Sequence, residues 1–204
     1  MTTHIRRVSL CFVSLLMLFP AKASVISYQF SGVVTQVPID EVFGDVGFGD
    51  SFEGSFNFDT SAVDLVPSDP STGSFSWTAP FGMTITVDGH QFDASDDLNI
   101  GVVDSFVDQY TVLAEDESLT IELFLEDPSG TAFSSDQLPA VFPPRSAFTR
   151  RDFHLDASLD AGEVQVDGQL SALTSTPEPS TPVAVTAGFI ILGLLKQLIK
   201  RRRF

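Results

Sequence analysis

The chain has 204 residues and a formal net charge of −16 at neutral pH. Its 27 acidic residues all lie between Asp40 and Glu178, where three arginines are the only basic residues, so that this interval carries a net charge of −24. Such a field repels nucleic acid and anionic lipid surfaces, which excludes nucleic acid as a partner. It is typical either of solubility in a salty medium or of the binding of divalent cations and basic partners.

The first 23 residues have the pattern of a secretory signal peptide, in which a basic segment precedes an apolar run, here residues 8–19. Small residues, Ala21 and Ala23, occupy the positions that signal peptidase reads. We expect cleavage after Ala23, so that Ser24 becomes the mature N-terminus and the chain is exported from the cytoplasm.

The single cysteine, Cys11, lies within this signal. The mature protein therefore has no disulfide, no thiolate nucleophile and no cysteine-based metal site. About 150 residues remain between the two terminal segments, which is the length of one domain and enough to bury a core.

Apolar and polar residues alternate with period two from Val25 onward, the pattern of half-buried β-strands. Turn sequences separate these strands, most clearly Asp88-Gly89 and residues 127–130. The expected strands cover residues 26–34, 51–58, 75–77, 83–87, 98–102, 110–112, 119–125, 153–159 and 164–170.

No helical period is present between the terminal segments, and short strands at roughly ten-residue spacing favour an all-β fold. We predict a single antiparallel β-sandwich over residues 24–174, jelly-roll-like, and the chain's nineteen phenylalanines suggest that its core is packed from aromatic side chains. A signal helix and a transmembrane helix are expected to flank it. Residues 171–181 are small, polar and proline-bearing, and we interpret them as the linker to the C-terminal tail.

The sequence offers no catalytic constellation. Residues 49–54 do not match the Gly-x-Ser-x-Gly nucleophile elbow. The two histidines of the body, His90 and His154, are not at metal-ligand spacing, and we interpret them as ordinary strand or surface residues. Carboxylates are so numerous that sequence cannot nominate the pair that a glycosidase needs. No enzymatic activity is predicted. A polysaccharide-acting hydrolase is less favoured than two other hypotheses, a non-enzymatic surface or matrix protein and a glycan-binding module.

Two groups of residues suggest ligand binding. Asp93, Asp96 and Asp97 follow a strand and offer the hard oxygen ligands that Ca²⁺ prefers, although aspartate also fills turns for local hydrogen-bonding reasons. No other metal or cofactor is predicted. The second group comprises three aromatic residues that form either a sugar-stacking platform or part of the core, namely Tyr28, Trp77 and Tyr110.

The C-terminal tail, residues 175–204, has the composition of a marginal membrane span. Its uncharged run, residues 183–195, would make a helix of about 20 Å, and continuing to Ile199 brings it to about 25 Å against a hydrocarbon core of about 30 Å. The basic cluster Lys200, Arg201, Arg202 and Arg203 should stay in the cytoplasm. The transmembrane segment is expected over residues 183–199, with the body on the outer side.

Five residues stand directly before this span: Pro177, Glu178, Pro179, Ser180 and Thr181. Together with the span and the basic end they resemble the PEP-CTERM sorting signal of Gram-negative bacteria. The tail departs from the usual pattern at Lys196 and in residues 197–199. The resemblance implies that an exosortase, a membrane-embedded sorting protease, reads the tail, and it implies a setting of exopolysaccharide and biofilm.

The body also resembles the β-rich domains that often precede this tail, through residues 32–35, 46–56 and 127–139. Those domains mostly lack an assigned activity. We therefore expect a non-enzymatic exported protein that is first anchored in the membrane and then reaches the cell surface or extracellular matrix. The alternative hypothesis is a glycan-binding module, with exopolysaccharide as partner and calcium as an aid. As an aromatic sugar-binding module it requires Trp77 and Tyr110 to be exposed on one face.

Overall fold

The computed structural model describes residues 25–37, 46–139, 141–159 and 162–177. Ten strands and one short 3₁₀ helix make up this part of the chain. The strands are β1 (Val25–Gln36), β2 (Ser51–Asp59), β3 (Thr72–Thr78), β4 (Gly82–Val87), β5 (His90–Ala94), β6 (Asp97–Val103), β7 (Asp108–Asp116), β8 (Leu119–Asp127), β9 (Arg150–Leu159) and β10 (Gly162–Pro177), and the helix is η3 (Arg145–Ala147).

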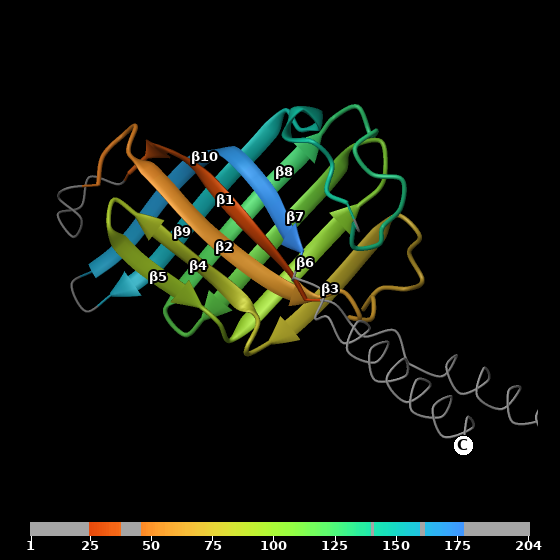
Figure 1. Ribbon diagram of the computed structural model, residues 1–204, viewed down its shortest axis with the longest axis horizontal. Helices are drawn as coiled ribbons and strands as arrows, with labels where there is room; N and C mark the ends of the chain where they lie inside the picture. Colours follow the sequence, from red (N-terminus) through yellow and green to blue (C-terminus); the bar gives the residue numbers. More distant parts are fainter. Residues whose placement is uncertain (1–24, 38–45, 140, 160–161, 178–204) are drawn as a thin grey trace, which may run out of the picture.

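All ten strands belong to one antiparallel sheet with the order β3-β6-β7-β8-β9-β10-β1-β2-β4-β5. The sheet curls over itself, so that β5 lies against β7 and β8, and β4 against β6 (Figure 1). The two halves enclose the core between them, as the layers of a sandwich do.

The prediction of an all-β antiparallel fold is confirmed. The predicted division into two jelly-roll sheets is not what the strand order shows, because the hydrogen-bonded order is continuous from one edge to the other. The two long strands β1 and β10 make this continuity possible, since their pairing contains register shifts between Ser31 and Gly32 and between Val34 and Gln36. Such bulges bend a strand and increase its twist.

The predicted signal helix and transmembrane helix fall in residues 1–23 and 183–199, outside the described residues. Among the residues that are described, no helix has the length and apolar character needed to cross a bilayer.

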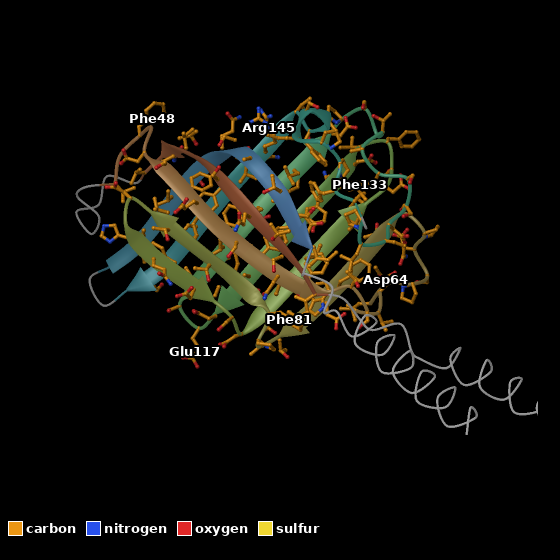
Figure 2. The ribbon with its side chains drawn as sticks, in the orientation of Figure 1. Phe48, Asp64, Phe81, Glu117, Phe133 and Arg145 are labelled. Atoms are coloured by element: carbon orange, nitrogen blue, oxygen red, sulfur yellow. The ribbon has the colours of Figure 1, made fainter. Side chains whose placement is uncertain are left out.

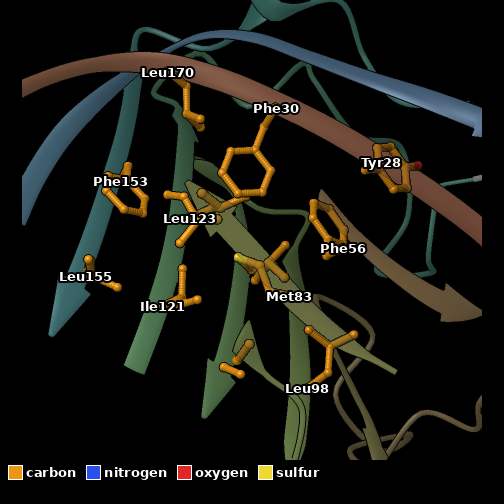
Figure 3. Packing of buried hydrophobic residues seen from close by; sticks show 14 of the residues in the cluster. Tyr28, Phe30, Phe56, Met83, Leu98, Ile121, Leu123, Phe153, Leu155 and Leu170 are labelled. Carbon is orange, nitrogen blue, oxygen red and sulfur yellow. The ribbon is translucent and has the colours of Figure 1, made fainter. Parts of the chain in front are cut away.

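Phenylalanine side chains fill much of the interior. Phe52, Phe56 and Phe58 alternate along β2 and are each at most 2% exposed. Phe133, in the β8–β9 loop, is also turned inward, whereas Phe48 points away from the body (Figure 2). Aromatic rings and aliphatic side chains from both halves of the curled sheet meet there, including Phe30 of β1 and Leu123 of β8 (Figure 3).

Inward-facing glycines make room for these rings. A Cβ atom at Gly32 would lie 2.3 Å from the ring of Phe52, and a Cβ atom at Gly168 would lie 2.5 Å from it. Phe30 covers Gly54, its direct cross-strand partner, in the same way. Each ring thus packs over a neighbouring strand's bare backbone, which strengthens a strand that glycine alone would weaken.

The two ends of the described body meet. Ile26, close to the start of β1, pairs with Pro177 at the end of β10. Residues 171–177, which composition predicted to be linker, are therefore strand, and that prediction was wrong for them. The reason is tertiary: β1 offers hydrogen-bonding groups to this segment, which outweighs its weak intrinsic preference for a strand.

Candidate functional site

A polar hollow lies on the outer face of the four neighbouring strands β10, β1, β2 and β4, with a volume of about 470 Å³. Eight outward-facing side chains line it: Gln29, Ser31, Glu53, Ser55, Thr84, Thr86, Ala172 and Thr174. We call this site the polar hollow. Its lining consists of hydroxyl, amide and methyl groups and one carboxylate.

Cross-strand pairing gathers these side chains into two rows. The rows are Thr174, Gln29, Ser55 and Thr84, and then Ala172, Ser31, Glu53 and Thr86. Neighbouring strands lie about 4.8 Å apart, so each row presents polar groups at regular short intervals. Sequence showed only that residues 51, 53, 55 and 57 are the polar side of one strand; the register brings in the other strands.

The polar hollow carries little charge. Glu53 is the only charged side chain in its lining, in a body whose residues 40–178 carry a net charge of −24. Hydroxyl and amide groups donate and accept hydrogen bonds without a strong field. The hollow is therefore suited to a neutral, hydroxyl-rich ligand rather than to an ion.

A second depression, of about 560 Å³, lies across the outer faces of β8, β9 and β10. Its charged members are Glu122, Arg150, Asp152, His154 and Asp167, and we call it the charged groove. Nδ1 of His154 lies 2.6 Å from Oδ1 of Asp167, and Nε of Arg150 donates to Asp152 at 2.5 Å.

Pairing of this kind balances charge on a solvated sheet face. Arg150 also lies over the ring of Phe124, with 4.7 Å from Cζ to the ring centroid. The side chains of Arg150 and Asp152 are 57% and 44% exposed, so their ion pair contributes little to stability. His154, one of the two histidines that sequence singled out, thus sits in a strand beside a carboxylate; His90 is the first residue of β5.

Carboxylates do meet in the charged groove, which sequence had not been able to anticipate. A glycosidase needs one carboxyl group in apolar surroundings and a second one that stays ionised. Here Asp152 contacts the guanidinium of Arg150 and Asp167 contacts the imidazole of His154. This arrangement lacks the contrast of environments on which that chemistry depends.

The three aromatic residues considered for sugar stacking are core residues. Tyr28, Trp77 and Tyr110 are 1%, 7% and 0% exposed, so the stacking platform is excluded and core packing is confirmed. Burial raises the pKa of Tyr28 to about 12 and that of Tyr110 well above its usual value. The indole N–H of Trp77 donates to the carbonyl oxygen of Asp59 at 3.1 Å.

The candidate calcium ligands are all exposed and lie on two strands and the turn between them. Asp93 is in β5, where its carboxylate accepts a hydrogen bond from the Gln91 amide at 2.9 Å. Asp97 begins β6 and pairs with Glu115 of β7, and Asp96 precedes it. Within the ranges that the structure describes, no three His, Cys, Asp or Glu side chains form a group that could hold a metal ion.

Sequence reasoning missed a pair of buried carboxylates. Asp108 and Asp127 are directly opposite each other in the β7–β8 ladder and are 0% and 3% exposed. Asp108 accepts hydrogen bonds from the backbone N–H groups of Ser105 and Phe133, at 3.2 and 2.8 Å. The only available signal was that each aspartate stands at the boundary between a strand and a loop.

Asp127 fastens the start of the loop that follows β8. Its carboxylate accepts hydrogen bonds from the hydroxyl and N–H of Ser129 and from the N–H and hydroxyl of Thr131. These bonds, first those from Ser129, lower the pKa of Asp127 to about 2. The carboxylate of Asp127 therefore stays ionised near neutral pH, and both aspartates fasten loops through the hydrogen bonds that they accept.

Of the sorting residues, only Pro177 is described, at the end of β10. Residues 178–181, the basic cluster 200–203 and the signal-cleavage residues 21–24 lie outside the described ranges. Comparison with known proteins finds no matching family model, no matching curated protein and no matching solved structure.

Proposed function

We propose that this chain is a non-enzymatic exported protein, sorted through its C-terminal Pro-Glu-Pro tail by an exosortase to the cell surface or extracellular matrix. The observation that carries the proposal is the sequence Pro177-Glu178-Pro179-Ser180-Thr181 followed at once by an uncharged run and a basic end. The signal helix and the transmembrane helix are part of this proposal. In this proposal the signal helix and the transmembrane helix each require the body to lie outside the cytoplasm.

The end of the body supports this reading. The last strand ends at Pro177, the first residue of the motif, so five residues separate the sheet from the expected span at Val183. Proline at 177 and 179 keeps the chain extended there, which a protease requires of its substrate. The proposed motif thus begins where the described body ends and directly precedes the expected membrane segment.

Deletion of residues 177–179 should leave the precursor in the membrane fraction, because the exosortase no longer finds its motif. Replacement of the same three residues by alanine is the matched variant, since it removes the motif and preserves the spacing. Fractionation and immunoblotting of the producing cells measure the outcome. Unchanged processing and distribution of both variants would refute the sorting proposal.

A second candidate function, glycan binding, is favoured by the polar hollow. With Tyr28, Trp77 and Tyr110 buried, the proposed mode is hydrogen bonding to a neutral polysaccharide rather than aromatic stacking. The hydroxyl and amide rows match the hydroxyl groups of such a ligand, and Glu53 is the only charge that it would meet.

Retention on the neutral and acidic fractions of the producer's exopolysaccharide tests this candidate. We expect retention on the neutral fraction, loss of retention for Thr84→Arg, which fills the hollow, and normal retention for Thr111→Arg. Thr111 faces outward on β7 with similar exposure, so it is the matched control. Runs with calcium and with EDTA tell whether Asp93, Asp96 and Asp97 contribute. A wild-type protein that neither fraction retains would exclude glycan binding.

A further inference from the structure

We propose that Ser171–Pro177, the last seven residues of β10, form a releasable segment that is docked on β1 in the folded body and detaches to become the spacer when the tail is processed. This inference rests on the proposed sorting function. It reconciles a composition typical of a linker with a structure in which the same residues are strand.

The releasable segment is paired on one side only. β9 pairs with residues 162–169 of β10, whereas β1 pairs with residues 167–177. Leu170, 2% exposed, is the last residue of β10 up to Thr176 whose side chain is deeply buried. Beyond it, Leu173 is partly buried and packs on the core, while Ser171, Thr174, Ser175 and Thr176 are exposed. A segment with few deeply buried side chains that pairs with only one strand of the described sheet opens locally at low cost.

Besides the backbone ladder to β1, a small number of side-chain hydrogen bonds hold the segment in place. At its start, a register shift sets off Ser171, whose hydroxyl donates to the carbonyl oxygen of Ser31 at 3.1 Å. The Arg145 guanidinium, in the β8–β9 loop, donates to the carbonyl oxygen of Ser171 (Figure 2). Near its end, the Thr176 hydroxyl donates to the carbonyl oxygen of Ser27 at 3.1 Å. None of these contacts is buried, so water can replace each of them.

Release of the segment lengthens the free chain between the body and the expected membrane segment. With the segment docked, the chain from Pro177 to Val183 spans at most about 20 Å, which is less than the diameter of a small protein domain, about 30 Å. With the segment detached, the free chain runs from Leu170 to Val183 and spans up to about 45 Å. A protease that must enclose the motif between body and membrane gains the room it needs only in the detached state.

A disulfide across the terminal pair tests the proposal. Ser27 and Thr176 are direct cross-strand partners, at a separation that a disulfide can bridge, and the mature chain has no other cysteine. We expect the oxidised Ser27→Cys/Thr176→Cys protein to be processed slower by about tenfold or more, because the closed segment cannot reach the open state from which cleavage proceeds. A reductant should restore the rate.

The matched control places the same cross-link outside the segment. Val33 and Gln169 are also partners in the β1–β10 ladder and both are exposed, but Gln169 lies where β10 is paired on both sides. Oxidised Val33→Cys/Gln169→Cys should be processed at the wild-type rate. If both cross-linked proteins are processed at the wild-type rate, the releasable segment is refuted and the sorting function is not. If the wild-type protein itself is not processed, the proposed sorting function fails and the inference fails with it.

Hydrogen exchange on the unmodified full chain gives an independent measurement that requires no substitution. Amides of residues 172–176 should exchange at least about tenfold faster than strand amides of residues 163–169, because opening the former exposes the partly buried Leu173 but none of the deeply buried side chains of β10. Arg145→Gln should increase the difference, since it removes the contact to Ser171. Equal protection of the two halves of β10 would overturn the proposal.

Discussion

Replacing Phe52 with alanine should lower the free energy of unfolding by about 3–5 kcal/mol, the range for large aromatic side chains in protein cores. Phe52 is 1% exposed, and its ring centroid is 4.4 Å from that of Phe153 in the opposite half of the sheet. The ring covers Gly32 and Gly168, which have no side chains that could move into the space it leaves. The substitution therefore creates a cavity that the surroundings cannot close.

Chemical denaturation of the full chain, followed by tryptophan fluorescence, measures this loss. Trp77 is the chain's one tryptophan, is 7% exposed and lies 5.2 Å from Phe58 between ring centroids, so it reports on the core. Phe48→Ala is the control, because Phe48 is 83% exposed and its loss should change stability by less than about 0.5 kcal/mol. Similar losses for Phe52→Ala and Phe48→Ala would contradict the packing described here.

Replacing Asp108 with alanine should cost about 3 kcal/mol, although the residue is neither apolar nor near a candidate binding site. The substitution removes two hydrogen bonds to a fully buried carboxylate and leaves the N–H group of Phe133 without its acceptor. A buried donor without a partner costs about 1–3 kcal/mol, and hydrogen bonds to charged groups contribute about 1.5–3 kcal/mol each. Limited proteolysis should then cut the β8–β9 loop faster.

Asp116→Ala provides the comparison for Asp108. Asp116 accepts a hydrogen bond from the Ser118 N–H at 2.9 Å, but at the surface, where water replaces the lost partner. Its substitution should change stability by about 0.5 kcal/mol. The proposed role of Asp108 fails if Asp108→Ala unfolds at the same denaturant concentration as Asp116→Ala and its loop stays equally resistant to protease.

The sequence alone was enough to predict nine of the ten described strands and the side of each that is buried; β5 was missed, and the end of β10 was predicted to be linker. Period-two alternation in residues 51–58 placed Phe52, Phe56 and Phe58 inside, and the structure confirms this. Asp88-Gly89 predicted a hairpin turn, and both residues have the positive φ angles, 44° and 88°, that such a turn requires. These features are local, because alternation and turn chemistry depend on neighbours in the chain.

Strand order and register depended on the tertiary structure. Three features depend on contacts between residues far apart in sequence. They are the single curled sheet, the pairing of residues 171–177 with β1, and the hydrogen bond from the Phe133 N–H to Asp108. The polar hollow is the clearest case, since its rows bring Thr174 of β10 beside Gln29 of β1 and Thr84 of β4 beside Ser55 of β2.

The resemblance of the tail to a sorting signal, by contrast, is visible in the sequence, because consecutive residues carry it. The body's surface sites were not, because a one-residue change in the pairing of any strand would move its side chains to the other face. Which polar residues share the polar hollow, and which strand lies beside Pro177, is decided only when β1 and β10 pair in the folded sheet.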